Sequence, residues 1–205
     1  MNNWPQIFFA RHGETSWNLE GRYQGSLDIP LNETGQGQAD ACGPLLVQML
    51  KANSVDPTRI DWFSSPLSRA RETMERIRAA FDDELPDIRF DDRLREVSFG
   101  IMEGKLHSEL AGDVGVLAGK RKAGYWDYRP PKGESYEDVA DRLNSFKREL
   151  SGTSVIVAHG GVLRVMRHMI ENVPREEVVN WPPPQGAVAH FDGNTMKMHF
   201  ADIGI

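Results

Sequence analysis

The sequence has a single cysteine, Cys42, among 205 residues, so no disulfide can form within the chain. This fits a reducing cytoplasm, where we expect the protein to reside with Cys42 as a small packed side chain. No apolar run approaches the roughly 18 residues that a membrane-spanning helix needs. The first residues, MNNWPQIFF, have no basic stretch and no cleavage site of small residues, so we predict neither a secretory signal nor a membrane partner.

Positive charge is also in short supply. The formal net charge of −6 argues against non-specific binding to nucleic acid. Hydrophobic residues make up 40% of the chain and charged residues 26%, which suits one globular domain with a sizeable core. Because the chain has no internal repeat and no long linker, we expect residues 1–205 to form a single domain.

Signatures of several common chemistries are missing as well. The chain contains no G-x-x-x-x-G-K-[ST] phosphate loop and no G-x-S-x-G nucleophile turn. No H-x-x-x-H spacing is present, and the arginines beside the candidate histidines would repel a cation. We therefore expect no metal site and no cofactor.

Short apolar runs alternate with helix-like segments along the chain. We predict strands over residues 6–11, 60–65, 87–92 and 154–161, a hairpin over 186–200, and helices over 31–52, 66–81, 135–150 and 162–171. Thr34 is the expected N-cap of the first of these helices, and Ser135 with Asp138 forms a capping box for the third.

This alternation predicts an α/β fold: a mainly parallel β-sheet with helices on both faces. The final hairpin must add one antiparallel strand. The segment from about 97 to 132 breaks the alternation, so we expect it to form an inserted cap over the rim at the C-terminal ends of the strands.

Reactive residues follow three of the predicted strands. The first ends in Arg11-His12-Gly13, the second leads through Ser64-Ser65 to Arg69, and the last ends in His159-Gly160-Gly161. If these strands are parallel neighbours, the residues meet at the rim where α/β sheets bind ligands. Two arginines beside each other and a helix N-terminus both favour an anion, most naturally a phosphoryl group.

A neutral imidazole in such a place can attack phosphorus and form a phosphohistidine. Charge on the transferring group would be stabilised by Arg11, Arg69 and His159. The leaving oxygen needs a general acid, for which the spacing leaves Glu96 and Glu103 as alternatives.

Four segments resemble the histidine phosphatase superfamily of phosphoglycerate mutase-like proteins. They are RHGETSWNLEGRYQGSLDIPLNETGQGQA, SSPLSRARET, LREVSFGIMEG and VIVAHGGVLR, in the family's order. The resemblance implies that His12 is the phosphorylated nucleophile, that Glu96 is the proton donor, and that Arg11, Arg69 and His159 form the phosphate pocket. It also implies that Asn18 and Gln24 line the phosphate or substrate side of the pocket, with Thr15 holding the loop or contacting phosphate. Gly160 is a further expected substrate contact, because it precedes a helix whose N-terminal amides favour an anion.

The resemblance favours a phosphomonoesterase that acts on a small phosphorylated metabolite. HGGVLR has Gly161 where the mutase branch usually has asparagine, and the segment between GIMEG and PPKGES is short for a mutase. Two alternatives remain: a phosphoglycerate mutase dependent on 2,3-bisphosphoglycerate, in which Lys120, Arg121 and Lys122 could hold a substrate carboxylate, and a non-catalytic phosphate-binding module. The oligomeric state is open, and a homodimer is compatible with the sequence.

Overall fold

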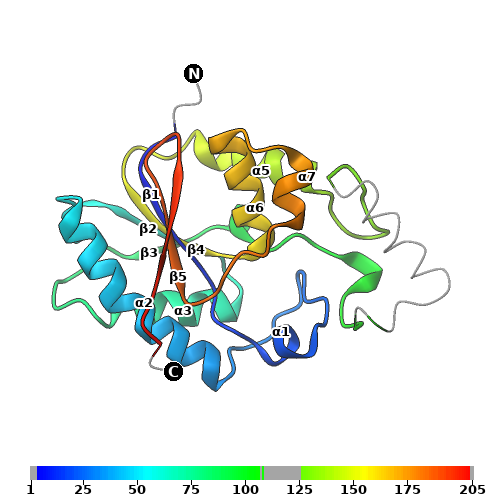
Figure 1. The fold of residues 1–205 in the computed structure, drawn as a ribbon, viewed down its shortest axis with the longest axis horizontal. Helices are drawn as coiled ribbons and strands as arrows, with labels where there is room; N and C mark the ends of the chain where they lie inside the picture. Colours follow the sequence, from blue (N-terminus) through cyan, green and yellow to red (C-terminus); the bar gives the residue numbers. More distant parts are fainter. Residues whose placement is uncertain (1–3, 107, 109–125, 204–205) are drawn as a thin grey trace.

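The fold is an α/β sandwich built on one twisted sheet (Figure 1). A computed structural model describes residues 4–106, 108 and 126–203. The sheet has six strands in the order β3-β2-β4-β1-β5-β6. Their bounds are β1 Ile7–Arg11, β2 Asp61–Ser64, β3 Ile88–Phe90, β4 Ser154–Ala158, β5 Ala187–Phe191 and β6 Met196–Phe200.

Strand direction follows the predicted pattern. The pairs β1–β4, β2–β4 and β2–β3 are parallel, and β5 runs antiparallel to both β1 and β6. The central strand β4 is buried along its whole length, as its uninterrupted apolar sequence SVIVA indicates. Because β2, β4 and β1 are neighbours, their C-terminal ends open on the same rim, which confirms the mainly parallel sheet.

Helices cover both faces of the sheet (Figure 1). Alternate strand residues, such as Phe8 and Val155, pack against α2 (Glu33–Ala52) and α3 (Ser68–Arg78) on one face. The others, such as Phe9 and Ile156, pack against α5 (Tyr136–Lys147), α6 (Gly160–Glu171) and α7 (Arg175–Asn180). A short helix, α1 (Ser16–Glu20), follows β1 beyond the rim. Short 3-10 turns complete the described chain at Pro57–Arg59, Asp92–Leu94 and Gly100–Met102.

Two helix starts differ from the sequence prediction. The N-cap of α2 is Asn32, whose side chain accepts from the Gly35 amide at 2.8 Å, so Thr34 lies inside the first turn and the prediction for it was wrong. Helix α6 begins at Gly160, two residues earlier than predicted. Ser135 does cap α5 through the expected capping box with Asp138.

Half of the predicted cap insertion, including Lys120, Arg121 and Lys122, lies outside the described residues, so the cap stays a prediction. Within the described residues, no helix combines the length and apolar character that a membrane crossing requires. Cys42 is buried among apolar side chains of α2 and α3, and burial raises the pKa of its thiol to about 12.

Candidate active site

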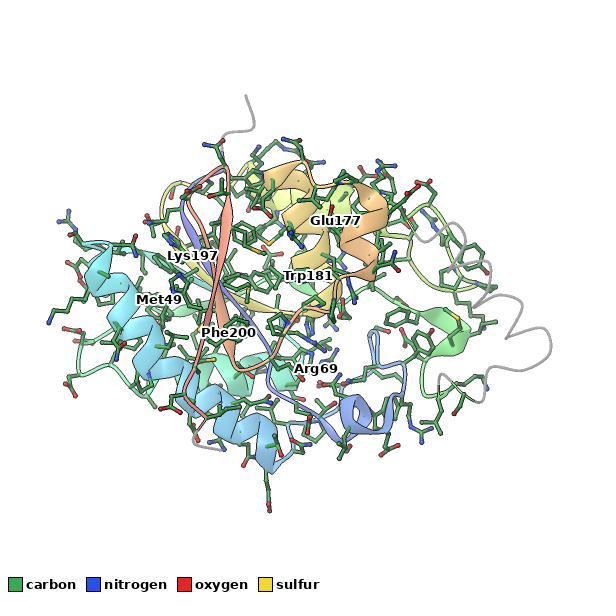
Figure 2. All side chains as sticks on the ribbon, in the orientation of Figure 1. Met49, Arg69, Glu177, Trp181, Lys197 and Phe200 are labelled. Atoms are coloured by element: carbon green, nitrogen blue, oxygen red, sulfur yellow. The ribbon has the colours of Figure 1, made fainter. Side chains whose placement is uncertain are left out.

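A pocket of about 260 Å³ opens at the rim that the strand ends form. Eight of the sequence-predicted residues lie in its wall or directly behind it. Arg11, His12, Asn18, Gln24, Arg69, Glu96 and Gly160 line the pocket, and Figure 2 shows Arg69 at the end of the sheet nearest α1. His159 is fully buried behind it, with its ring centroid 5.1 Å from that of His12.

The backbone around His12 holds its ring in one orientation. Its own amide extends the β1–β4 pairing by donating to Ala158 O at 2.9 Å. Nδ1 lies 2.7 Å from Gly13 O, so Nδ1 carries the proton and donates it, leaving the lone pair on Nε2. Gly13 is required here because a Cβ would lie 2.1 Å from Gly35 O.

Burial also controls the protonation of both histidines. The pKa of His12 is held well below its usual value by burial, and further by the charges of Arg69 and Arg11. Burial and then Arg69 lower the pKa of His159 in the same way. Both rings are therefore neutral at pH 7, which is the state a nitrogen nucleophile needs.

The two predicted arginines are anchored by backbone carbonyls. Arg11 Nη1 donates to Pro183 O at 2.6 Å, and Arg69 donates through Nη1 to Leu27 O and through Nη2 to Gly25 O. Burial lowers the pKa of Arg11 to about 10, so its guanidinium stays charged at neutral pH. Nε of both arginines and Nδ1 of His159 are buried without a hydrogen-bond partner among the described residues. The two arginine N–H groups are donors that a bound anion would satisfy.

The structure separates the two candidate acids. Glu96 lies in the pocket wall, and its carboxylate accepts from the Gly161 amide at 3.0 and 3.1 Å. Glu103 does not line the pocket. It accepts from the amide and hydroxyl of Ser26, from the Ser98 hydroxyl and from the Phe99 amide, and so joins two loops. The amides at the start of α6 were predicted to bind an anion. One of them, the Gly161 amide, binds the carboxylate of Glu96 instead.

Thr15 occupies a structural position. It is the N-cap of α1 and forms a capping box with Asn18, and it is fully buried away from the pocket lining. This arrangement favours the loop-holding alternative for Thr15. Asn18 Oδ1 accepts from Thr15 and from Gln185, while Gln24 lines the pocket with its Oε1 buried and unpartnered within the described chain.

A family model decides the relationship of this chain to known proteins. The model of the histidine phosphatase superfamily, branch 1, matches residues 7–204. This chain belongs to that superfamily. The superfamily resemblance drawn from the four sequence motifs is therefore confirmed.

Three known proteins illustrate the similarity. A 2,3-bisphosphoglycerate-dependent phosphoglycerate mutase of Gloeobacter violaceus is 32% identical over 179 residues, covering 84% of this chain and 78% of the relative. A probable phosphoglycerate mutase of Escherichia coli is 34% identical over 174 residues, covering 82% and 76%. The crystal structure of a putative alpha-ribazole-5'-P phosphatase from Escherichia coli superposes with a TM-score of 0.77 at 24% identity, covering 98% and 97%, which shows a shared fold.

In this member of the superfamily, a pocket segment that the sequence did not indicate lies between α7 and β5. Arg164 Nε donates to Trp181 O at 2.9 Å, and Pro182 and Pro183 line the pocket. Gln185 Nε2 donates to His12 O at 3.1 Å. The contact between Gln185 and the loop of His12 joins positions about 170 apart in the chain, so no local pattern signals it.

Arg164 itself could have been found. It stands four residues after Gly160 on α6, and residues at this spacing share one helix face. A predicted pocket residue at Gly160 therefore points to Arg164 as a second one, and the structure places both in the pocket wall.

Proposed function

We propose that this chain hydrolyses phosphomonoesters of small metabolites through a phosphohistidine on His12. The observation that carries the proposal is the state of the His12 ring, which is neutral, holds its proton on Nδ1 and lines an arginine-rich pocket. Each of these conditions favours attack by Nε2 on a phosphorus atom. A packed structural histidine needs none of them.

The transferring phosphoryl group would lie between the two arginines. As Nε2 forms its bond to phosphorus, the bond from phosphorus to the ester oxygen breaks and negative charge spreads over the equatorial oxygens. Arg11 and Arg69 supply fixed positive charge, and Nδ1 of His159 supplies a further nitrogen without a partner in the described chain. Their backbone anchors keep these groups in place before the substrate arrives.

Glu96 is the proposed acid and base of the two half-reactions. Its protonated carboxyl gives a proton to the departing ester oxygen, which leaves as an alcohol. In the second step a water molecule attacks the phosphohistidine, the carboxylate takes the water's proton, and inorganic phosphate is released. The pocket volume of about 260 Å³ suits a small ester.

A phosphoglycerate mutase is the second candidate, because the curated relatives at 32% and 34% identity carry that name. Gly161 and the short segment before PPKGES support hydrolysis instead. The two functions are separated by one pair of assays on 3-phosphoglycerate: release of inorganic phosphate, and formation of 2-phosphoglycerate with 2,3-bisphosphoglycerate present. Phosphate release from several monoesters with negligible isomerisation is expected. Efficient isomerisation with little phosphate release would contradict the proposed hydrolysis and show that the protein is a phosphoglycerate mutase.

A further inference from the structure

A glutamine from outside the pocket wall holds two parts of the His12 loop. Gln185 does not line the pocket, but its Nε2 lies 3.1 Å from His12 O and 3.2 Å from Asn18 Oδ1. The pairing of Ala10 with Val188 explains these contacts, because antiparallel strands place the residues just before β5 opposite those just after β1. Gln185 therefore reaches the loop from a segment about 170 residues later in the chain.

The hydrogen bonds allow one orientation for each of the two side-chain amides. A backbone carbonyl only accepts, so the end of Gln185 that faces His12 O is its nitrogen. The same nitrogen and the Thr15 amide are both donors, and both lie 3.2 Å from one atom of Asn18. That atom must therefore be the oxygen, Oδ1. The Thr15 hydroxyl also donates to this oxygen at 3.2 Å.

Asn18 consequently has its nitrogen on the opposite side from these donors. Asn18 lines the pocket, and its Nδ2 has no hydrogen-bond partner among the described residues. An amide nitrogen carries two hydrogens to donate, which suits the oxygens of an anion, whereas Oδ1 in the same place would repel them. Since Arg11 and Arg69 lie in the same wall, the nitrogen adds a neutral donor beside two cations.

The segment that carries Gln185 is stiff. Residues 182–184 are all proline, whose ring fixes φ and whose nitrogen carries no hydrogen. Pro183 O accepts from Arg11 Nη1 at 2.6 Å, and β5 begins at Ala187. Gln185 thus lies between a hydrogen-bonded turn and a strand of the sheet, and its backbone has little freedom to move away from the loop.

We propose that Gln185 is a positioning residue that acts through Asn18: it holds Oδ1 away from the phosphoryl group, so that Nδ2 donates to that group. This inference rests on the proposed function, in which the phosphoryl group lies between Arg11 and Arg69. Gln185 touches neither the phosphorus nor its oxygens and takes no part in proton transfer. Its effect is on the polarity of the pocket wall, which presents a donor at Asn18 rather than an acceptor.

Binding of inorganic phosphate, measured by calorimetry, tests this role without any turnover. Gln185→Leu removes the donor that faces Oδ1, so Asn18 is free to turn its oxygen toward the pocket. We expect the affinity for phosphate to fall roughly fivefold, the contribution of one ordinary hydrogen bond. Gln38→Leu is the matched control, because Gln38 Oε1 accepts from the Glu14 amide of the same loop at 2.9 Å without involving Asn18. That variant should leave the affinity unchanged.

A double variant decides whether Gln185 acts through Asn18. Asn18→Ala is expected to weaken phosphate binding by roughly tenfold or more, because it removes a donor to an anion. In that background Gln185→Leu should cost less than about twofold further. No loss in the unmodified background, or the same loss in both backgrounds, would overturn the proposal. An unmodified chain that bound no phosphate would overturn it as well.

Gln185→Glu gives a second comparison, which decides the question if the leucine variant folds poorly. The side chain keeps its length, but its carboxylate places oxygen against His12 O and Asn18 Oδ1. Asn18 Nδ2 should then turn toward the carboxylate and away from the pocket. We expect a larger loss of phosphate affinity than with leucine, and a clearly smaller one in the Asn18→Ala background, where the added negative charge acts alone. Equal losses in the two backgrounds would reject the role of Asn18.

Failure of the proposed function would look different from failure of this inference. If the chain is not a phosphatase, the unmodified protein releases no phosphate from any ester, while its affinity for inorganic phosphate still responds to Gln185→Leu. If only the inference is wrong, esters are hydrolysed and the affinity for phosphate does not depend on residue 185 through Asn18.

Discussion

Nε2 of His159 lies 2.7 Å from the hydroxyl oxygen of Ser65, and both side chains are fully buried. The Ser65 amide donates to Val157 O, which extends the β2–β4 pairing and sets the serine beside the ring. The Leu67 amide points to the same hydroxyl oxygen at 3.4 Å. A hydroxyl that accepts from this amide has its own proton to donate to Nε2. We therefore expect His159 to carry its ring proton on Nδ1, the nitrogen that is unpartnered within the described residues.

Replacement of Ser65 by alanine removes this hydrogen bond, so the ring proton of His159 should then be found on either nitrogen. We expect Ser65→Ala to lower kcat/KM by roughly tenfold, because one typical hydrogen bond between neutral groups contributes up to about 1.5 kcal/mol. Nitrogen NMR of histidine-labelled protein should show the Nδ1–H form of His159 in the unmodified chain and a mixture in the variant. An Nε2–H form in the unmodified chain would contradict this assignment. Ser64→Ala, one residue earlier in the buried strand β2, is the control for packing.

His12→Ala should abolish phosphoryl transfer, because among the described residues His12 is the histidine that lines the pocket. Turnover should fall by several orders of magnitude while the melting temperature stays near that of the unmodified chain. Rapid quenching with labelled substrate should yield an acid-labile, base-stable phosphoprotein only when His12 is present. If the His12→Ala protein also became labelled, the phosphorylated residue would not be His12.

The two glutamates of the third motif should respond in opposite ways. Glu96→Gln is expected to slow hydrolysis of an alkyl phosphate by about 10²- to 10⁴-fold, the usual contribution of a general acid, and that of p-nitrophenyl phosphate far less. Glu103→Gln should reduce thermal stability, because its carboxylate joins Ser26 to Ser98 and Phe99. The ratio of the two rates should stay unchanged in that variant. A reversed pattern would transfer the acid role to Glu103.

Stability should fall as the solution becomes mildly acidic. The folded-state pKa values of His12 and His159 lie well below the value near 6.5 of an unfolded chain. The unfolded chain therefore binds protons first, and the free energy of unfolding decreases as pH drops below about 6.5. Above about pH 7 these groups are neutral in both states and have no effect.

Thermal melts between pH 8 and pH 5 check this sign. The double variant His12→Asn/His159→Asn should show a shallower decline than the unmodified chain. A residual slope is expected, because burial also lowers the pKa values of His190 and His199. An identical slope in both proteins would show that the buried pair does not control this window.

Activity should not depend on a divalent metal. The pocket draws its positive charge from Arg11 and Arg69, and within the described chain no group of three or more potential ligand side chains could hold a metal ion. Excess chelator should leave kcat/KM unchanged, and vanadate should compete with substrate because it can adopt the geometry of the transferring phosphorus. Loss of activity with chelator and recovery with one metal would contradict this prediction.

Local sequence patterns were enough to predict the sheet and the rim. Runs such as SVIVA are typical of buried strands. His12 and His159 directly follow their strands, and Arg69 comes five residues after the end of β2. The Ser135 capping box was equally readable, because both partners lie within one helical turn. For the first helix, two polar residues compete as caps, and only the folded backbone places Asn32 rather than Thr34 at the helix start.

Roles that depend on distant partners were decided by the tertiary structure. The spacing of Glu96 and Glu103 in the sequence does not indicate which of them reaches the pocket. Glu96 does so because the Gly161 amide of α6, 65 residues later, lies opposite it. The contacts of Gln185 with the His12 loop likewise join segments that meet only when β5 pairs with β1. A single sequence encodes short-range hydrogen bonds and periodicity directly. Which distant side chains share a pocket follows from how the sheet brings its strand ends together.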